Sequence, residues 1–463
     1  MKGLYILPIL VFLLASCQPA PPEKGPLRVS EINPRYFTDG TGKAVYLTGA
    51  HTWNNLVDMH AAEAADTFDF QAYLDFTESH HLNFMRLWAW ELTNWNTSGN
   101  REEEPQVLLV EPHPWARTGP GTALDGKPKF DLREFNPDYF RRLRQRVEAA
   151  RDRNIYLAIM LFEGWGLQFS PEAYAHHPFH PRNNVNDLGL DTASERRLEI
   201  HELLHDKVLA VQEAYVKRVI ETVHDLDNVL YEISNENHPP STEWQYHMVR
   251  LVKDHEKQLG VRHPVGMTFQ YRGGSNQALF DSPADWISPN PEGGYRDNPP
   301  LAGGNKVIIT DTDHLWGIGG NRAWVWKSFL RGMNPLFMDP YDGKVLEGSA
   351  YAKNLDAEMI RENLGYTMVF ARKLDLLHMV PDSTTSSSKY CLTNPGKAYL
   401  TYLPEGNAVQ LDLTEATGSL RVEWFDPATG AKADGSPVQG GDTVTLSSPF
   451  PTGEALLYAF ADE

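Results

Sequence analysis

Eight short apolar segments constrain the fold of this 463-residue chain more than any other feature. Each segment is typical of a β-strand, and helices, or connections long enough to hold a helix, separate successive segments. Such alternation predicts a parallel sheet, and eight repeats predict a closed (β/α)8 barrel, the TIM barrel. The segments are one that ends at Gly49 and residues 82–88, 155–162, 229–233, 264–269, 286–288, 306–310 and 336–338.

An open, doubly wound sheet is the alternative α/β architecture. It would place a glycine-rich phosphate-binding turn after an early strand, and the sequence has no such turn. Two connections are unusually long, residues 92–135 and 166–193, and they follow the second and third strands. In a barrel, connections at these positions build the active site.

The last part of the chain changes character. Short β-rich runs alternate with turn-forming residues such as Asp426-Pro427-Ala428-Thr429-Gly430, which predicts a small antiparallel β-sandwich. The polar stretch 383–388 indicates the boundary between the two domains. We therefore expect the barrel over residues 31–383 and the sandwich over residues 384–463. The runs are residues 398–403, 408–413, 420–425, 443–446 and 455–459.

The N-terminus has the pattern of a signal peptide over residues 1–16. A charged head precedes an apolar run that is too short to cross a bilayer, and Leu14-Ala15-Ser16-Cys17 resembles a bacterial lipoprotein box. That resemblance implies a lipid on Cys17, a spacer over residues 17–30 and a location in the cell envelope. Gln18 after the cysteine favours the outer membrane. The alternative is an ordinary signal peptide in which Cys17 is incidental.

Composition narrows the possible partners. The 42 Lys and Arg against 61 Asp and Glu give a net charge of −19, which repels nucleic acid and anionic lipid. We therefore expect no nucleic-acid partner and membrane contact through the lipid anchor alone. The 12 Trp, 19 Tyr and 20 Phe suit surfaces that stack on sugars.

Carboxylates follow two of the predicted strands. Strand four ends in Glu232-Ile233-Ser234-Asn235-Glu236, and strand seven ends in Asp311-Thr312-Asp313. The carboxyl ends of barrel strands face one pocket, so these groups are expected to converge. Glycoside hydrolysis needs one protonated carboxyl group and one ionised carboxylate, and differences in burial and mutual repulsion would separate their pKa values.

The sequence resembles the clan A glycoside hydrolases, in which Asn-Glu closes strand four and a second acid closes strand seven. It is similar more narrowly to the apiosidase-like barrels, which carry a C-terminal domain named for collagen binding. This resemblance implies Glu236 as acid and base, Asn235 on the sugar 2-hydroxyl, Arg86 beneath the nucleophile and Asp311 as the nucleophile. The motifs behind it are residues 47–53, 83–87, 177–179, 183–186, 231–236 and 424–430.

The clan has Glu where this chain has Asp311. The shorter side chain leaves three possibilities open. The backbone at Asp311 could approach the substrate more closely, or Asp313 could be the true partner of Glu236. The third is that the two carboxylates lie further apart and the enzyme inverts the anomeric centre. The resemblance itself implies a retaining mechanism, with carboxylates about 5–5.5 Å apart.

Further side chains lie at or just beyond the predicted strand ends. Glu163 and Glu91 are candidates for binding substrate hydroxyls or for an alternative acid, and a solvated or arginine-paired role at the rim is the interpretation that we favour. The other candidates for sugar contacts, with packing of the barrel top as the alternative, are His51, Trp53, His238, His314 and Trp316.

Three histidines, His176, His177 and His180, share one connection. That connection has no carboxylate at ligand spacing, so we expect local packing there, and no metal or cofactor.

Together these features predict a secreted, lipid-anchored glycoside hydrolase that acts on poly- or oligosaccharides. Two alternatives remain open. The barrel could be a catalytically inactive glycan-binding or adhesive surface protein, or the sandwich could be the working part, binding protein or matrix.

Overall fold

The computed structural model describes residues 24–461, except for residue 63 and residues 65–66, 101–104, 347–351 and 452. The predicted signal peptide and Cys17 lie outside the described residues. Among the helices that the structure does describe, none has both the length and the apolar character needed to cross a membrane.

Eight parallel strands close into a barrel in the order β10-β11-β12-β13-β14-β15-β3-β5, which confirms the predicted fold. The first strand begins at Gly49, although the sequence predicts that it ends there. Every residue of these strands is buried, because helices cover the outside and side chains fill the inside. The strands are β3 (Gly49–His51), β5 (Phe84–Leu87), β10 (Tyr156–Glu163), β11 (Val229–Asn235), β12 (Val265–Thr268), β13 (Trp286–Ser288), β14 (Val307–Asp311) and β15 (Asn334–Met338).

The barrel closes between β3 and β5, where Gly49 pairs with Phe84. A Cβ at position 49 would lie 1.7 Å from the carbonyl oxygen of Phe84. Only glycine allows this approach of two backbones.

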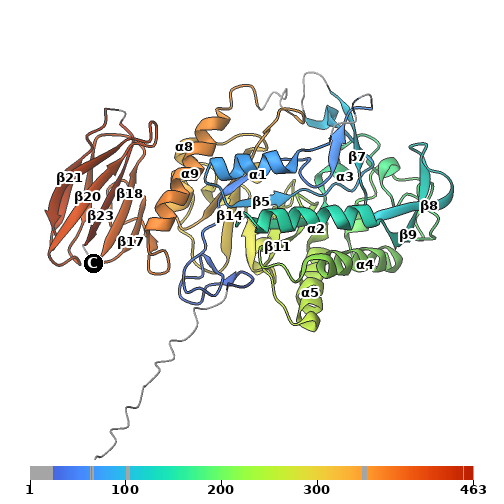
Figure 1. The fold of residues 1–463 in the computed structure, drawn as a ribbon, viewed down its shortest axis with the longest axis horizontal. Helices are drawn as coiled ribbons and strands as arrows, with labels where there is room; N and C mark the ends of the chain where they lie inside the picture. The colour runs from blue at the N-terminus through green and yellow to red at the C-terminus, as the bar shows by residue number, and fades with distance from the viewer. Residues whose placement is uncertain are drawn as a thin grey trace, which may run out of the picture.

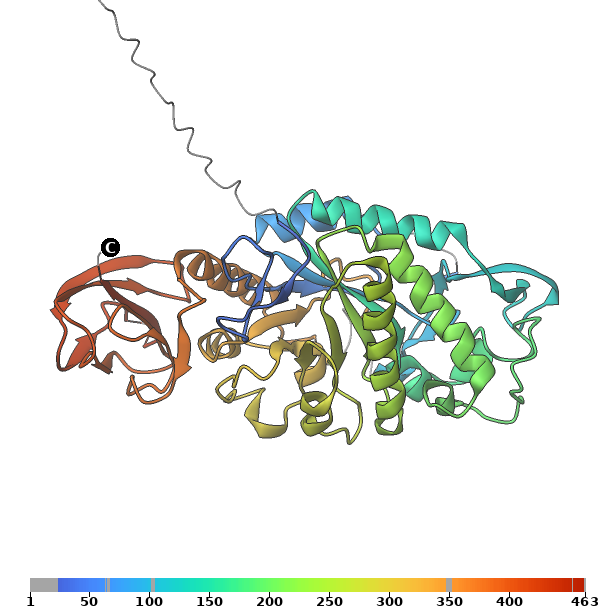
Figure 2. The same ribbon diagram turned by 90° about the horizontal axis from the view of Figure 1, so that it is seen from below.

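Helices surround the barrel (Figures 1 and 2). The α2 helix (Pro137–Arg151) illustrates how sequence sets their starts: the side chain of Asn136 accepts a hydrogen bond of 3.0 Å from the N–H of Asp138, and Pro137 is the first helical residue. The remaining α-helices in the described part of the chain are α1 (Phe70–Ser79), α3 (Trp165–Phe169), α4 (Asp206–Val223), α5 (Thr242–Leu259), α6 (Asn276–Asp281), α7 (Thr312–Trp316), α8 (Arg322–Leu330) and α9 (Ala357–Lys373).

The long connection after β5 folds into strands of its own. β6 (Asn94–Asn96) and β7 (Val107–Glu111) form a three-stranded sheet with β4 (Asp58–His60). β8 (Trp115–Thr122) and β9 (Pro128–Phe135) form a separate antiparallel pair at the side of the barrel away from the C-terminal domain (Figure 1). Because this connection leaves the carboxyl end of β5, it builds up one side of that end of the barrel.

The folded part of the chain begins at an earlier residue than the sequence predicts. β1 (Arg28–Val29) pairs with β2 (Phe37–Thr38), and Leu27 is buried beneath the barrel strands. The folded part therefore begins before residue 31, and the predicted spacer over residues 17–30 is too long at its C-terminal end.

The C-terminal domain is the predicted antiparallel β-sandwich, and all five predicted runs are strands. Its larger sheet has the order β16-β17-β18-β23-β20-β21, and β19 and β22 form the second layer. The sheet begins at Val380, before the expected boundary at residue 384. The strands are β16 (Val380–Asp382), β17 (Cys391–Asn394), β18 (Ala398–Leu403), β19 (Ala408–Asp412), β20 (Ser419–Phe425), β21 (Lys432–Gln439), β22 (Thr443–Ser447) and β23 (Ala455–Ala461).

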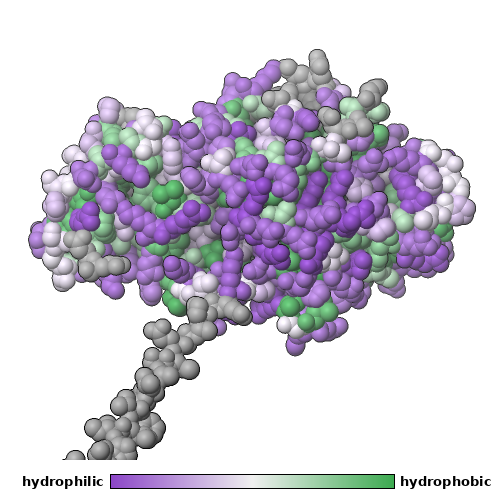
Figure 3. Space-filling model, in the orientation of Figure 1, coloured by the Kyte–Doolittle hydropathy of each residue, from purple (hydrophilic) through white to green (hydrophobic). Residues whose placement is uncertain are grey.

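The sandwich packs against α8 and α9 through an apolar interface. Trp326 and Phe370 from these helices contact Phe425 of β20, with ring centroids 6.0 Å and 5.5 Å away. An ion pair of 2.6 Å between Arg322 and Glu454 borders this contact. The apolar side chains of this interface are buried. The face seen in Figure 3 is mainly hydrophilic over the barrel, with hydrophobic side chains scattered between.

Candidate active site

Arg86 on β5 is the centre of a buried charge network at the barrel's carboxyl end. Its guanidinium group binds both carboxylate oxygens of Glu232, at 2.7 Å and 2.6 Å, and the Oδ1 atom of Asn235, at 2.6 Å. It also donates to Asp311 at 2.9 Å and to Asp313 at 3.3 Å. Burial opposes the charge on Arg86, but Glu232 and Asp311 outweigh it and raise the pKa of the guanidinium group.

Asp311 is a member of this network. Its side chain is 1% exposed, and it contacts the Nε2 atom of His51 at 2.9 Å and Nη1 of Arg86 at 2.9 Å. Its Oδ1 atom also accepts the N–H of Asp313, which caps α7. Burial would raise the pKa of Asp311, but His51 and Arg86 outweigh burial and hold it below its ordinary range. Asp311 is therefore an ionised carboxylate with its oxygens already in use.

Asp313 has the opposite character, although it lies only two residues further along. Its side chain is 10% exposed, and its contact with Arg86 is longer than that of Asp311. Burial, helped by the charge of Asp311 and opposed by Arg86, raises the pKa of Asp313 to about 7. Asp313 is therefore the strand-seven carboxylate that can still accept or release a proton near neutral pH.

Glu236 follows β11 with a backbone φ of 42°, in the left-handed region. A non-glycine residue there is uncommon, and such residues cluster at functional sites. Its backbone carbonyl accepts a hydrogen bond of 2.7 Å from Gln168. Burial raises the pKa of the Glu236 carboxyl group well above its usual value, and Asp313 and Glu163 add to the shift. Burial therefore favours the protonated form of Glu236.

Glu163 ends β10 and is the third carboxyl group of the site. Its two oxygens accept the N–H groups of Trp165 and Gly166, at 2.9 Å and 2.7 Å. Burial raises its pKa to about 8 despite these hydrogen bonds.

Glu91 lies behind Glu163 and accepts its backbone N–H at 3.0 Å. The carboxylate of Glu91 also contacts His177 at 3.4 Å and His201 at 3.2 Å. Burial opposes its charge, but the two histidines lower the pKa of Glu91 to about 2. Glu91 is therefore paired with two histidines and not with an arginine, and it does not line the cavity described below.

Asn235 is fixed between two donors. Its Oδ1 atom accepts a hydrogen bond from Arg86 and lies 3.1 Å from the Nε2 atom of His314. The Nδ1 atom of the same histidine lies 2.7 Å from the hydroxyl of Ser288. Burial and the charge of Arg86 lower the pKa of His314 to about 3. The histidine is therefore neutral: its Nε2–H donates to Asn235, and its Nδ1 accepts from Ser288.

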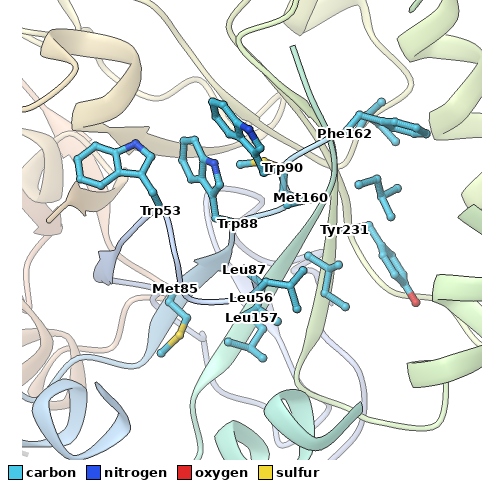
Figure 4. Close-up of a cluster of buried hydrophobic side chains, with 14 of the residues drawn as sticks. Trp53, Leu56, Met85, Leu87, Trp88, Trp90, Leu157, Met160, Phe162 and Tyr231 are labelled. Carbon is cyan, nitrogen blue, oxygen red and sulfur yellow. The ribbon is translucent and has the colours of Figure 1, made fainter. Parts of the chain in front are cut away.

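A cavity of about 360 Å³ opens above these groups. Seven of the predicted site residues line it: Trp53, Glu163, Asn235, Glu236, Asp313, His314 and Trp316. Figure 4 shows the indoles of Trp53, Trp88 and Trp90 at one end of a buried cluster that continues down into the barrel. The aromatic residues along the cavity are Trp53, Trp88, Trp90, Trp95, Trp165, Phe169, Phe269, Tyr271 and Trp316.

Besides Glu91, four predicted site residues are not part of this lining. Arg86, Asp311 and His51 lie below it, and Trp88 covers Arg86 and stacks on His51, with centroid distances of 4.9 Å and 5.6 Å. His238 is held by Asn237 and by Glu202, at 2.9 Å each.

Two arginines of the cavity, Arg272 and Arg296, are not among the residues that the sequence singles out. Both lie in connections after barrel strands, where sequence patterns alone do not show which side chains turn inward. The same holds for Trp88, Trp90 and Trp165. The sequence does contain a signal for Trp88 and Trp90, because these two tryptophans lie two residues apart directly after β5.

The three histidines of the connection after β10 do not converge on a metal site. His177 contacts Glu91, whereas His176 lies near Asn94, at 3.2 Å. Across the described residues, no group of three or more His, Cys, Asp or Glu side chains is arranged to hold a metal ion.

Comparisons with known proteins agree with this architecture. Residues 110–271 match the family described as "Domain of unknown function (DUF6298)", and residues 377–455 match "Putative collagen-binding domain of a collagenase". A search of curated proteins found no match.

Solved structures share the fold at low sequence identity. A glycoside hydrolase family 5 protein from Bacteroides vulgatus is 12% identical with a TM-score of 0.61, over 94% of this chain and 93% of its own. A structure titled "Glycoside hydrolase" is 11% identical with a TM-score of 0.57, over 95% and 97%. A second B. vulgatus structure, described as "a putative glycoside hydrolase", is 13% identical with a TM-score of 0.61, over 95% of this chain and 83% of its own.

Proposed function

We propose that this chain is a glycoside hydrolase that cleaves O-glycosidic bonds in poly- or oligosaccharides with Glu236 and Asp313 as its carboxylate pair. One observation carries the proposal: both carboxyl groups line a single aromatic cavity at the carboxyl end of the barrel. This is the end at which TIM-barrel enzymes hold their active sites. The sugar-stacking surface and the acid pair are therefore in one place.

The environments of the two groups assign their roles. Burial and the nearby Asp313 and Glu163 raise the pKa of Glu236 and favour its protonated form, which gives its proton to the leaving oxygen. Asp313 ionises as the pH rises through about 7 and remains held by Arg86. Its carboxylate attacks the anomeric carbon, and the glycosidic bond breaks as the leaving oxygen takes the proton.

The second step restores both groups in a retaining mechanism. Ionised Glu236 takes a proton from a water molecule, the water oxygen attacks the anomeric carbon, and the bond to Asp313 breaks. Asp311 supports this chemistry without taking part in it, because it fixes Arg86 and caps α7. The assignment of Asp313 favours one of the alternatives that the sequence left open.

The likeness to the apiosidase-like barrels and the lipid anchor belong to the same proposal. An enzyme attached through Cys17 to the cell envelope, at the outer membrane, would meet polysaccharides outside the cytoplasm. The sandwich takes a structural role in this account, because its apolar face is committed to α8 and α9.

A screen for released sugar tests the proposal. A soluble form that starts at Gln18 is incubated with plant and bacterial glycans, beside Glu236→Gln and the control Glu243→Gln, which alters an exposed glutamate of α5. We expect cleavage by the parent and the control, and a loss of about 10²-fold or more in Glu236→Gln. Binding of a glycan by the parent without release would contradict the proposal.

A further inference from the structure

Asn237 directly follows the acid Glu236, and every polar atom of its side chain is held. Its Nδ2 atom donates to Nδ1 of His201 at 2.9 Å and to the hydroxyl of Ser234 at 3.0 Å. Its Oδ1 atom accepts the backbone N–H of His238 at 2.9 Å and lies 2.9 Å from Nδ1 of the same residue. An asparagine amide has two donor hydrogens and two acceptor lone pairs, so these contacts use all four.

His201 connects Asn237 to Glu91. The backbone N–H of His238 can only donate, so it must face Oδ1 of Asn237, and Nδ2 therefore faces His201. Nδ1 of His201 is then an acceptor, and its Nε2 atom carries the hydrogen that is donated to Glu91 at 3.2 Å. The contacts thus fix His201 as a neutral imidazole in one tautomer.

The carboxylate of Glu91 supports this orientation of His201. His177 has the same tautomer, because its Nδ1 atom accepts the N–H of Phe179 at 3.0 Å and its Nε2 atom lies 3.4 Å from Glu91. The backbone N–H of Glu163 is the third donor to this carboxylate. One buried anion therefore anchors the end of β10 and, through His201, the residue after the acid.

Close packing restricts Asn237 further. A Cβ at position 164 would lie 2.4 Å from the Cα atom of Asn237 and 2.6 Å from its Cγ atom, so Gly164 allows the ends of β10 and β11 to meet here. The buried ring of His201 stacks on Trp244 and packs edge-on to Phe162, with centroid distances of 4.7 Å and 5.8 Å. The histidine therefore cannot turn away from Asn237 without disturbing the barrel.

The strained residue lies between two anchored asparagines. A left-handed backbone such as that of Glu236, with φ of 42°, costs a non-glycine residue free energy and persists only where the surroundings impose it. Asn235 precedes Glu236 and is held by Arg86 and His314. Asn237 follows it and is held through His201, so both neighbours of the acid are fixed by buried side chains.

We propose that His201 is a positioning residue for the acid: supported by Glu91, it fixes Asn237 and with it the backbone conformation that places the Glu236 carboxyl group in the cavity. His201, Glu91 and Asn237 do not line the cavity, so their effect on a substrate passes through Glu236, which does. This inference rests on the proposed function and adds a residue to its machinery. A displacement of a reacting group by about 1 Å can slow a reaction about 10²-fold.

Two substitutions of His201 separate hydrogen bonding from packing. His201→Asn places an amide oxygen as many bonds from the backbone as Nδ1 and removes the ring, whereas His201→Phe keeps a ring against Trp244 and removes both nitrogens. On the glycan that the parent cleaves, we expect His201→Phe to lower kcat about tenfold or more and to change KM less than about threefold. His201→Asn should keep kcat within about threefold of the parent, because Asn237 retains an acceptor.

The matched control is His263→Phe. His263 is also buried and also pairs with a carboxylate, that of Glu256 at 2.6 Å, but it precedes β12, at the barrel end opposite the cavity. Its loss should lower the melting temperature and leave kcat within about twofold of the parent. Glu91→Gln keeps the inference testable if a His201 variant does not fold: its amide N–H₂ group faces N–H donors, so kcat should fall about threefold or more at unchanged KM.

Hydrogen exchange measures the same effect without turnover. In the peptide that contains Glu236 and Asn237, amide exchange should be about tenfold faster or more in His201→Phe than in the parent, because the strained backbone opens more often. His201→Asn should stay near the parental rate, and His263→Phe should leave this peptide unchanged.

The outcomes separate the two proposals. A kcat of His201→Phe equal to that of the parent, a His201→Asn protein slower than His201→Phe, or a loss that lies in KM alone would overturn the inference and leave the hydrolase standing. If the parent cleaves no glycan, the hydrolase fails and exchange decides the inference. Faster exchange at Glu236 and Asn237 in His201→Phe, but not in His201→Asn, would then support it, and equal exchange in all three proteins would overturn it.

Discussion

Replacing Asp313 by Asn is expected to stabilise the fold at alkaline pH while removing activity. Burial raises the pKa of Asp313 from 3.8 to about 7, so the folded state binds this proton more tightly than the unfolded state does. The stability that the proton contributes is complete below the unfolded pKa and is lost as the pH rises through 7. A shift of about 3 units corresponds to about 4 kcal/mol.

Urea unfolding of the parent and Asp313→Asn at pH 4 and pH 8 measures this effect. Asparagine cannot ionise, so the variant keeps the stability that the parent loses over this range. The difference in unfolding free energy, variant minus parent, should increase by about 4 kcal/mol between the two pH values. Titrating groups remote from Asp313 are common to both proteins and cancel in the comparison, whereas Glu236, whose pKa Asp313 helps to raise, contributes a smaller difference of its own.

The control is Asp254→Asn, which alters an exposed aspartate of α5. Its difference from the parent should stay constant within about 0.5 kcal/mol. Stability curves of the parent and Asp313→Asn that run parallel from pH 4 to pH 8 would refute the reasoning. They would mean that Asp313 is already ionised in the folded protein at low pH.

Three further predictions follow from the same geometry. Activity should rise as the pH increases through about 7, because Asp313 must ionise, and should fall at higher pH as Glu236 loses its raised-pKa proton; a rate that is highest at pH 5 would contradict this order. Arg86→Met should cost about 3–5 kcal/mol in urea unfolding, because it leaves Glu232 and Asp311 as buried charges without their cation; a cost below about 1 kcal/mol would show that the network adds little. Gly49→Ala should abolish soluble expression, because its Cβ would lie 1.7 Å from a backbone oxygen at the barrel seam; normal yield and an unchanged melting temperature would contradict the tight closure.

The barrel could be predicted because its strands are buried on both faces. A strand such as β10 is therefore a continuous apolar run that a sequence shows directly. The sequence predicts that the first strand ends at Gly49, and this is wrong: the strand begins there, because Gly49 is the position at which two backbones meet.

The candidate site was predictable at the level of strand ends. Glu236 and Asn235 lie where the resemblance implies. The choice between Asp311 and Asp313 could not be made, since the strand gives way to a helix between them and side-chain alternation no longer applies. Contacts between distant segments, such as Glu91 with His201, depend on the fold of long connections that have no repeating pattern.

Covalent trapping tests the central claim most directly, which is that Asp313 and Glu236 form the working pair. The probe is a 2-deoxy-2-fluoro glycoside of the sugar that the parent releases, and it carries a good leaving group. The fluorine slows hydrolysis of the glycosyl-enzyme, so the ester between sugar and carboxylate accumulates. Peptide mass spectrometry then locates the labelled residue. The account predicts one sugar per chain, attached to Asp313, with Asp311 unmodified. A label on Asp311 or on Glu236, or cleavage that inverts the anomeric centre and leaves no label, would contradict it.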